Sequence, residues 1–320
     1  MLRTLMAARI IVIVAVLAAV GVAVAHDWAA VKGTVAKLSW VSLAASFVSA
    51  ALALFATMKV WHVLLAGLGS RVHTSHASHI YFTGQLARYV PGSVWAVLMQ
   101  AHLGRAHRVP RIRAMLALLL AVMVTTATGL TVTVFVVPTL GHRWGSAAMV
   151  LLLGPLTLLA LTPPLFTKAA DLALRLLRRP PLERAIPARS IAIAAAWSFA
   201  AWALYGLHLF VLAHAVRGAD LTDYPRITAT LALAVCAGFL AFLLPSGIGV
   251  REAVIVAGLA GSMSAGSALA VALMSRLLCA LCDVLSAAVA SIASRVVRQR
   301  HARADRYAGP PIPSGSPSAV

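Results

Sequence analysis

Five ionisable side chains lie inside or beside long apolar stretches of this 320-residue chain: Arg88, Arg251, Glu252, Arg276 and Asp283. An ionisable group inside a membrane span costs roughly 2.5–3.5 kcal/mol on insertion scales, so such groups usually face a partner or a polar cavity. Guanidinium groups bind phosphates, and carboxylates bind cationic groups or orient arginines. These residues are therefore the first candidates for a binding site.

The pair Arg251 and Glu252 directly follows a Gly-rich segment, Pro245-Ser246-Gly247-Ile248-Gly249. A helix that begins there offers free amides and a positive dipole end. We expect Arg251 and the backbone from Gly247 to Gly249 to contact a phosphate, with Glu252 orienting Arg251 or meeting a cationic headgroup. The alternative is an interfacial Arg–Glu pair that only caps the helix.

Arg276 and Asp283 are seven residues apart, so both project from one face of the last apolar helix. We expect a structural role in which they pair with Glu252 or Arg251 across helices. Direct contact with a substrate is the alternative.

Histidine and cysteine give a weaker signal. His73, His76 and His79 have no accompanying carboxylate, so solvated loop histidines are favoured over a metal site. Cys279 and Cys282 have CxxC spacing but no second ligand pair, which favours close helix packing over a redox or metal pair. No nucleotide-binding loop or Ser–His–Asp arrangement is recognised, so neither a cofactor nor an enzyme is expected.

The elements that must position these residues are membrane helices. Hydrophobic residues make up 61% of the chain and charged residues 11%, which excludes an ordinary soluble domain. A span needs about 20 apolar residues. The composition predicts an all-α transmembrane bundle of about six full spans: Ile10–Ala25, Leu38–Thr57, Met115–Val137, Ala147–Phe166, Ile191–Val216 and Ser267–Ala293.

The basic residues predict the orientation. Counted in alternate loops, one set holds nineteen Lys and Arg residues and the other five, so both termini should face the cytoplasm. The net charge of +19 therefore reflects cytoplasmic loops of a multi-pass protein of the cytoplasmic membrane, with no nucleic-acid partner. Met1–Ala25 also resembles a cleavable signal peptide, which would leave the downstream topology unchanged.

Two further apolar segments are broken by Pro and Gly. Ile80–Gln100 is interrupted at Pro91-Gly92, which leaves two arms of roughly 15 Å each, and we expect a re-entrant hairpin from the cytoplasmic side. Arg226–Gly261 is interrupted at Pro245–Gly249 and enters from the other side, either as a re-entrant element or as two crossings. Such a pair suggests an inverted repeat and points to a transporter's binding site. Arg88 precedes the first break, where Tyr89 and Trp95 would close a groove or pack at the interface.

At both breaks the residues resemble one prokaryotic family. The segment from Gln85 to Trp95, with Tyr89-Val90-Pro91-Gly92 at its centre, is similar to the family's Y-[IV]-P-G-x-[VI]-[GW] motif. The segment Pro245–Glu252 resembles its later P-x-G-[IL]-G-x-R-E motif. This is the flippase-like family, also called the lysylphosphatidylglycerol synthase transmembrane domain family. The resemblance extends from about Leu5 to Arg295.

The resemblance implies movement of a lipid between leaflets, with an anionic phospholipid or a polyprenyl-linked lipid as the membrane partner. Residues 1–295 would form the transmembrane domain and residues 296–320 a disordered, basic and Pro/Ser-rich cytoplasmic tail, with no soluble synthase domain. A non-transporting scaffold for a lipid or cell-envelope enzyme and a membrane-embedded lipid transferase are the alternatives. A homo-oligomer or an envelope-enzyme partner is compatible with all three.

Overall fold

The computed structural model describes residues 21–89, 94–105, 109–134, 161–176, 178–181, 185–240 and 249–307, with single residues at 156, 159 and 247. Side chains are described over the same ranges except at 88, 94–97, 240 and 297–307. The fold is all-α, as predicted, and the helices are α2 (Trp28–Lys37), α3 (Trp40–Gly67), α4 (Thr74–Leu86), η1 (Ala87–Tyr89), α5 (Val94–Arg105), α6 (Arg111–Val132), α8 (Pro163–Leu176), α9 (Ala188–Arg217), η3 (Leu221–Asp223), α10 (Tyr224–Leu240), α11 (Val250–Leu259) and α12 (Ala265–Tyr307).

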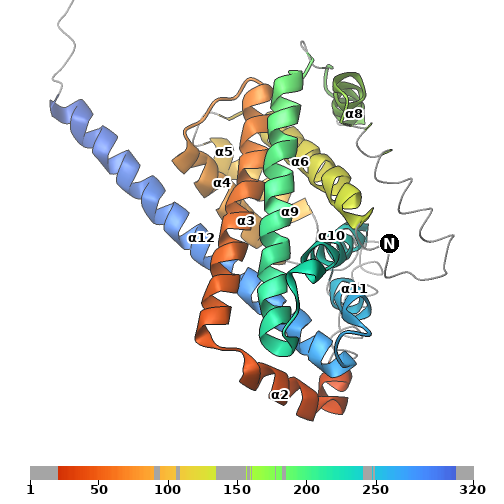
Figure 1. Cartoon of the computed structure of the whole chain (residues 1–320). Helices are drawn as coiled ribbons and strands as arrows, with labels where there is room; N and C mark the ends of the chain where they lie inside the picture. The colour runs from red at the N-terminus through yellow and green to blue at the C-terminus, as the bar shows by residue number, and fades with distance from the viewer. Residues whose placement is uncertain are drawn as a thin grey trace, which may run out of the picture.

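Four of these helices, α3, α6, α9 and α12, are long and apolar enough to cross a membrane. They correspond to four of the predicted spans and confirm them by length and composition. The other two, Ile10–Ala25 and Ala147–Phe166, fall largely outside the described residues, as does most of Met1–Ala25. Figure 1 shows α3 and α9 side by side, with α12 crossing the bundle obliquely behind them.

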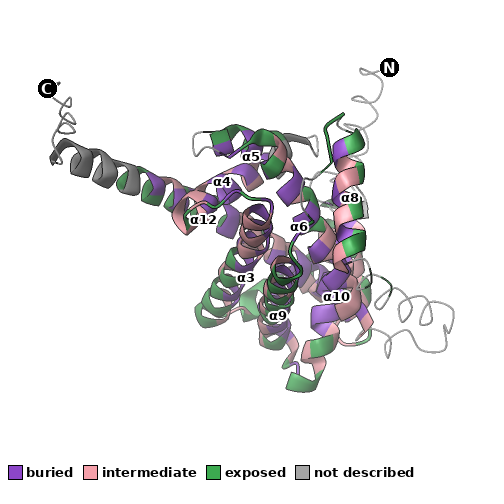
Figure 2. Cartoon of the chain, turned by 90° about the horizontal axis from the view of Figure 1, so that it is seen from above, coloured by how far each residue is buried: buried purple, intermediate pink, exposed green. Residues whose placement is uncertain are grey.

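The outer faces of the long helices are apolar and exposed, whereas their inner faces are buried (Figure 2). Large exposed apolar side chains include Leu52 and Phe55 on α3, Phe199 and Leu207 on α9, and Leu277, Val284 and Ile292 on α12. A soluble monomer rarely exposes so much contiguous apolar surface. Because lipid tails are as apolar as these side chains, the surface is that of a membrane protein.

Local signals set several helix ends. Ser39 caps α3 by accepting a hydrogen bond from the Ser42 amide at 3.1 Å. Gly218 ends α9 in the left-handed conformation, with φ of 67°. α3 continues to Gly67, beyond the predicted end at Thr57, because no Pro or Gly interrupts it. Lys59, predicted in a loop, therefore lies within the helix, with its Nζ 5.9 Å from the centre of the Trp197 ring.

The end of α12 differs from the predicted domain boundary. The helix continues to Tyr307, so the first part of the predicted disordered tail, which begins at residue 296, is helical. The reason is composition, because Arg, Gln and Ala are good helix formers and the first Gly after the predicted boundary is Gly309. The remainder of that tail lies outside the described residues.

The described connections lie at the two ends of the molecule. At one end, Arg113 donates a hydrogen bond to the Gly69 carbonyl at 3.1 Å, and a Cβ on Gly67 would lie 3.0 Å from Ser190 Oγ. At the other end, Thr34 Oγ1 donates to Ser267 Oγ at 3.0 Å. The basic loops after α3, before α6 and before α9 thus share one end (Figure 1).

Candidate functional site

A charged pair joins α11 to α12 inside the bundle. Arg276 Nε lies 3.0 Å from Glu252 Oε1, and the two side chains are 22% and 7% exposed. The pairing across helices that we predicted for Arg276 is therefore confirmed, whereas the described contact of Asp283 is with Tyr89 and not with Glu252. In the Arg276–Glu252 pair, each charge offsets part of the cost of desolvating the other, because an ion pair compensates for lost hydration.

The second oxygen of Glu252 caps α11. Oε2 accepts a hydrogen bond from the Gly249 amide at 2.7 Å, which satisfies one of the free amides at the start of the helix. The Gly249 amide that we expected to face a phosphate is thus occupied by the protein's own carboxylate. The expectation that Glu252 orients Arg251 is not supported either, since the described contacts of Glu252 are with Gly249 and Arg276. Both oxygens of the carboxylate are used elsewhere.

Arg251 lies against α10 instead. Its guanidinium carbon is 5.8 Å from the centre of the Phe239 ring, and a Cβ on Gly238 would lie 2.7 Å from Arg251 Nε. Gly247 approaches the same place, because a Cβ on this residue would lie 2.7 Å from Gly238 Cα. Gly247 has a φ of 66°, a conformation that other residues rarely adopt. Glycine at both positions therefore lets this loop and Arg251 pack directly on the α10 backbone.

A second polar contact ties α12 to the other broken element. The Tyr89 hydroxyl, in η1, donates a hydrogen bond to Asp283 Oδ2 at 2.5 Å, and Asp283 is 2% exposed. Tyr89 itself is exposed. Of the remaining predicted site residues, Pro91, Gly92 and Pro245 lie outside the described residues, as do the side chains of Arg88 and Trp95.

Both broken elements are helical hairpins in the described residues. α4 packs against α5, and α10 packs against α11. α11 has 10 residues, about 15 Å, which is half of the roughly 30 Å that a span must cross. That length favours the re-entrant interpretation over two crossings, whereas the depth of either hairpin in the membrane stays a prediction.

Inside the first hairpin lies Gln100, which we did not single out from the sequence. Its side chain is fully buried against Gly84, where a Cβ would lie 2.3 Å from Gln100 Cγ. Neither its Oε1 nor its Nε2 has a hydrogen-bond partner among the described residues. A buried amide without a partner is rare and costly, so a bound water or ligand is the partner to test for at this side chain. The only sequence signal was a Gln inside an apolar arm.

His208 was also missed. Fully buried in α9, it contacts α3 through Ser46 Oγ, 2.7 Å from its Nδ1, and α12 through Ser275 Oγ, 2.8 Å from its Nε2. Nδ1 is also 3.0 Å from the Ser46 carbonyl oxygen. This three-helix network lies one residue from Arg276. A histidine in the middle of the predicted span Ile191–Val216 was the available signal.

His76 and His79, predicted to be solvated loop residues, lie within α4 and are partly buried, because the helix begins at Thr74. The other histidine of this group and the cysteines also have structural contacts. His73 caps α4, and His79 Nδ1 lies 3.4 Å from Ser291 Oγ. All three cysteines are free thiols; Cys282 Sγ lies 3.5 Å from the Phe47 carbonyl and Cys279 Sγ 3.8 Å from His208 Nε2. Helix packing accounts for these positions. Within the described part of the chain no three His, Cys, Asp or Glu side chains are grouped as metal ligands.

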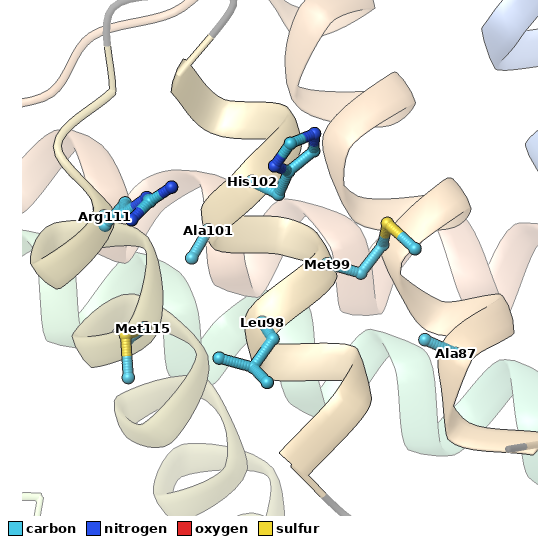
Figure 3. Close-up of a pocket in the computed structure, with 7 residues that line it drawn as sticks. All are labelled: Ala87, Leu98, Met99, Ala101, His102, Arg111 and Met115. Atoms are coloured by element: carbon cyan, nitrogen blue, oxygen red, sulfur yellow. The ribbon is translucent and has the colours of Figure 1, made fainter.

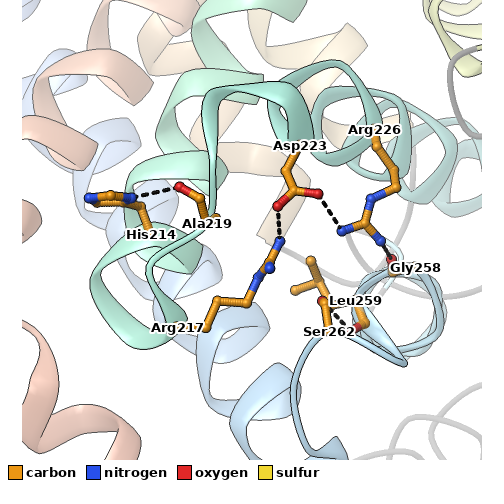
Figure 4. Close-up of polar contacts among 8 residues, drawn as sticks. All are labelled: His214, Arg217, Ala219, Asp223, Arg226, Gly258, Leu259 and Ser262. Carbon is orange, nitrogen blue, oxygen red and sulfur yellow. Dashed lines mark hydrogen bonds and ion pairs between the residues drawn. The ribbon is translucent and has the colours of Figure 1, made fainter.

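Two polar features lie outside the predicted site. A pocket of about 620 Å³ opens between α5 and α6 and is lined by Ala87, Leu98, Met99, Ala101, His102, Arg111 and Met115 (Figure 3). At the opposite end, Asp223 lies between Arg217, at 2.6 Å, and Arg226, at 3.0 Å (Figure 4). Burial raises the pKa of Asp223, but hydrogen bonds and charges from the two arginines outweigh that effect and lower the pKa below its usual value.

The chain was compared with known proteins. A family model described as lysylphosphatidylglycerol synthase TM region matches residues 6–286. No curated protein and no solved structure matches the chain. The family match includes both broken elements and the long helices α3, α6 and α9, and it ends within α12.

Proposed function

Because the chain belongs to the lysylphosphatidylglycerol synthase transmembrane family, whose members are membrane proteins linked to lipid synthesis or flipping, we propose that it moves a phospholipid or lipid-linked precursor across the cytoplasmic membrane. One observation carries the proposal. α12 contacts both broken hairpins through polar side chains seven residues apart, in the pairs Arg276–Glu252 and Asp283–Tyr89, and the carboxylate of each pair is buried.

Moving a lipid between leaflets requires polar groups at mid-depth, since a charged headgroup must pass hydrocarbon while its tails stay in lipid. Arg276 is the partly exposed member of its pair, so a headgroup phosphate could replace Glu252 as its partner. Arg251, packed on Gly238, supplies a second guanidinium next to the Gly-rich loop. Movement of the hairpins about α12 would open a path on each side in turn.

The test is leaflet exchange in proteoliposomes. Fluorescent phosphatidylglycerol, aminoacylated phosphatidylglycerol and polyprenyl phosphate are compared with wild-type protein, Arg251→Ala and the control Arg189→Ala, an exposed arginine at the start of α9. We expect exchange of one lipid class, lost in Arg251→Ala and kept in Arg189→Ala. All three proteins must elute as monodisperse species and unfold cooperatively.

Two outcomes would contradict the proposal. A scaffold would exchange none of the three lipids, and its association with an envelope enzyme would tolerate Arg251→Ala but not loss of the basic loops. A transferase would convert a lipid donor in detergent, where no second compartment exists. Exchange that persists unchanged in Arg251→Ala would leave a translocator but remove its proposed phosphate contact.

A further inference from the structure

The pocket between α5 and α6 has a polar side and an apolar side. Leu98, Met99 and Met115 line its apolar part, and two basic side chains, His102 of α5 and Arg111 of α6, also line it (Figure 3). Its volume of about 620 Å³ falls within the roughly 300–1,000 Å³ typical of ligand pockets. None of the residues predicted for the translocation site lines it.

Among the residues that the structure describes, no carboxylate lines the pocket near Arg111 and His102. No Asp or Glu occurs between residues 28 and 170, which include all of α3, α4, α5 and α6. α8, which packs on α6, contains Asp171, but this residue does not line the pocket. Arg111 and His102 are exposed, and neither makes a hydrogen bond or ion pair with any described residue. Since no carboxylate among the described residues lines the pocket, we take the negative charge at this position to come from a bound ligand.

The surroundings limit what can supply that charge. Leu98 and Met99 are 47% and 41% exposed, so the apolar side opens outward and does not close into a core. Arg111 lies at the end of the molecule where the basic loops gather. An anion with a long apolar part, lying where the membrane surface meets this end, matches both sides of the pocket. A free phosphate would match only the cationic side.

We infer that this pocket binds an anionic phospholipid of the leaflet on the basic-loop side. Its phosphate contacts Arg111 and His102, and its acyl chains begin along Leu98, Met99 and Met115. Arginine is well suited to the phosphate because its planar guanidinium donates two parallel hydrogen bonds. The site is separate from Arg251 and Arg276, and it places a lipid against the hairpin that holds Tyr89.

Photo-crosslinking tests the inference without requiring transport. Proteoliposomes are prepared with phosphatidylglycerol or phosphatidylcholine bearing a diazirine near the start of one acyl chain, and crosslinked peptides are mapped by mass spectrometry. In wild type we expect phosphatidylglycerol to label the segment 98–115. The double variant Arg111→Gln/His102→Gln should reduce that labelling about tenfold, as loss of charge-assisted hydrogen bonds predicts. Arg105→Gln, an exposed arginine at the end of α5 that does not line the pocket, should keep it.

A second variant tests the apolar side. Leu98→Trp fills the opening from an exposed position and should reduce labelling while the protein still elutes and unfolds like wild type. Equal labelling by phosphatidylcholine, unchanged labelling in the double variant, or loss of labelling with excess inorganic phosphate would each overturn the inference. If crosslinking failed while leaflet exchange was intact, only the lipid site proposed in this pocket would be rejected. Labelling as expected without any exchange would instead contradict the proposed function.

Discussion

At the scale of single residues, Glu252 shows how one side chain serves two helices. One oxygen caps α11 at Gly249, and the other binds Arg276 of α12. Loss of the carboxylate would free the Gly249 amide and remove the negative charge that pairs with the partly buried Arg276 guanidinium. The pair thus fixes where the second hairpin meets α12, the contact on which the proposed function depends.

Gln100 allows a prediction about stability. Gln100→Met removes an amide that has no partner among the described residues and keeps the side-chain length, so we expect stabilisation by about 1–2 kcal/mol. Thermal unfolding of the detergent-purified protein measures it. Destabilisation would mean that the amide has a bound partner such as water. Reduced leaflet exchange in a stabilised Gln100→Met variant would assign the amide to the lipid path.

The two serines that contact His208 should contribute differently to stability. Ser275→Ala removes the oxygen that pairs with Nε2 among the described residues and should destabilise the protein by about 1–2 kcal/mol. Ser46→Ala leaves Nδ1 with the Ser46 carbonyl at 3.0 Å and should cost less. Unfolding temperatures of the two variants, compared side by side, check the order. The reverse order would show that Ser46 Oγ is the more important contact of this histidine.

At the scale of elements, small residues allow the short helices to pack closely. A Cβ on Gly206 of α9 would lie 2.0 Å from Thr228 Oγ1 of α10, and one on Gly258 of α11 would lie 2.3 Å from Thr230 Cγ2. Helix association in membranes relies on such close contact, because lipid provides little hydrophobic driving force. α10 is thus held between α9 and α11.

Gly258→Ala should therefore loosen the second hairpin. We expect destabilisation by about 1–3 kcal/mol, the usual cost of overpacking. Gly33→Ala in α2 is the matched control, because nothing lies within 4 Å of the added Cβ, and alanine should be neutral or stabilising there. Thermal unfolding of both variants is the measurement. Equal effects at the two positions would contradict this packing.

The connection between α9 and α10 predicts a pH effect. The lowered pKa of Asp223 means that its ion pairs with Arg217 and Arg226 stabilise the fold above the ordinary carboxyl pKa, and that this stabilisation is lost as pH falls through the lowered pKa. Asp223→Asn should thus show a smaller fall in unfolding temperature than wild type between about pH 6 and pH 3. Asp220→Asn, at an exposed position whose side chain makes no described hydrogen bond, should behave like wild type. A wild-type-like fall in Asp223→Asn would contradict the assignment.

At the scale of the whole molecule, α12 packs against both hairpins, and α3 and α9 pack against each other and against α12 (Figure 1). The polar contacts lie along α12, and the connections lie at the two ends. The pocket next to the first hairpin adds a lipid site at the basic end. This arrangement would let a lipid approach one hairpin from one leaflet and leave past the other.

The orientation can be tested directly. In a protein whose three native cysteines are replaced by alanine, Arg71→Cys and Arg189→Cys should react with an impermeant maleimide only from the cytoplasmic side. Lys37→Cys and Asp220→Cys should react only from the opposite side. Intact cells expose the external side of the membrane to the reagent, and inside-out vesicles expose the cytoplasmic side. If all four cysteine variants were labelled from the same side, the predicted assignment of alternate loops to opposite sides of the membrane would be wrong.

The sequence alone determined the membrane class, four of the spans, the two interrupted segments and the ionisable residues within them. These properties are local, because a span requires a continuous apolar run whose backbone hydrogen bonds are satisfied within the helix. The Arg276–Glu252 pair was also predictable. The apolar stretches contain few ionisable residues, so each buried charge has few candidates of opposite sign with which to pair.

Only the tertiary structure decided which atoms meet. Glu252 contacts Gly249 and Arg276 and not Arg251, and Asp283 reaches Tyr89, because helix rotation and crossing set these distances. Gln100 and His208 are single polar residues in apolar runs, whose burial depends on helices far away in the sequence. One-dimensional patterns record which residues are polar, whereas three-dimensional packing determines which of them have partners.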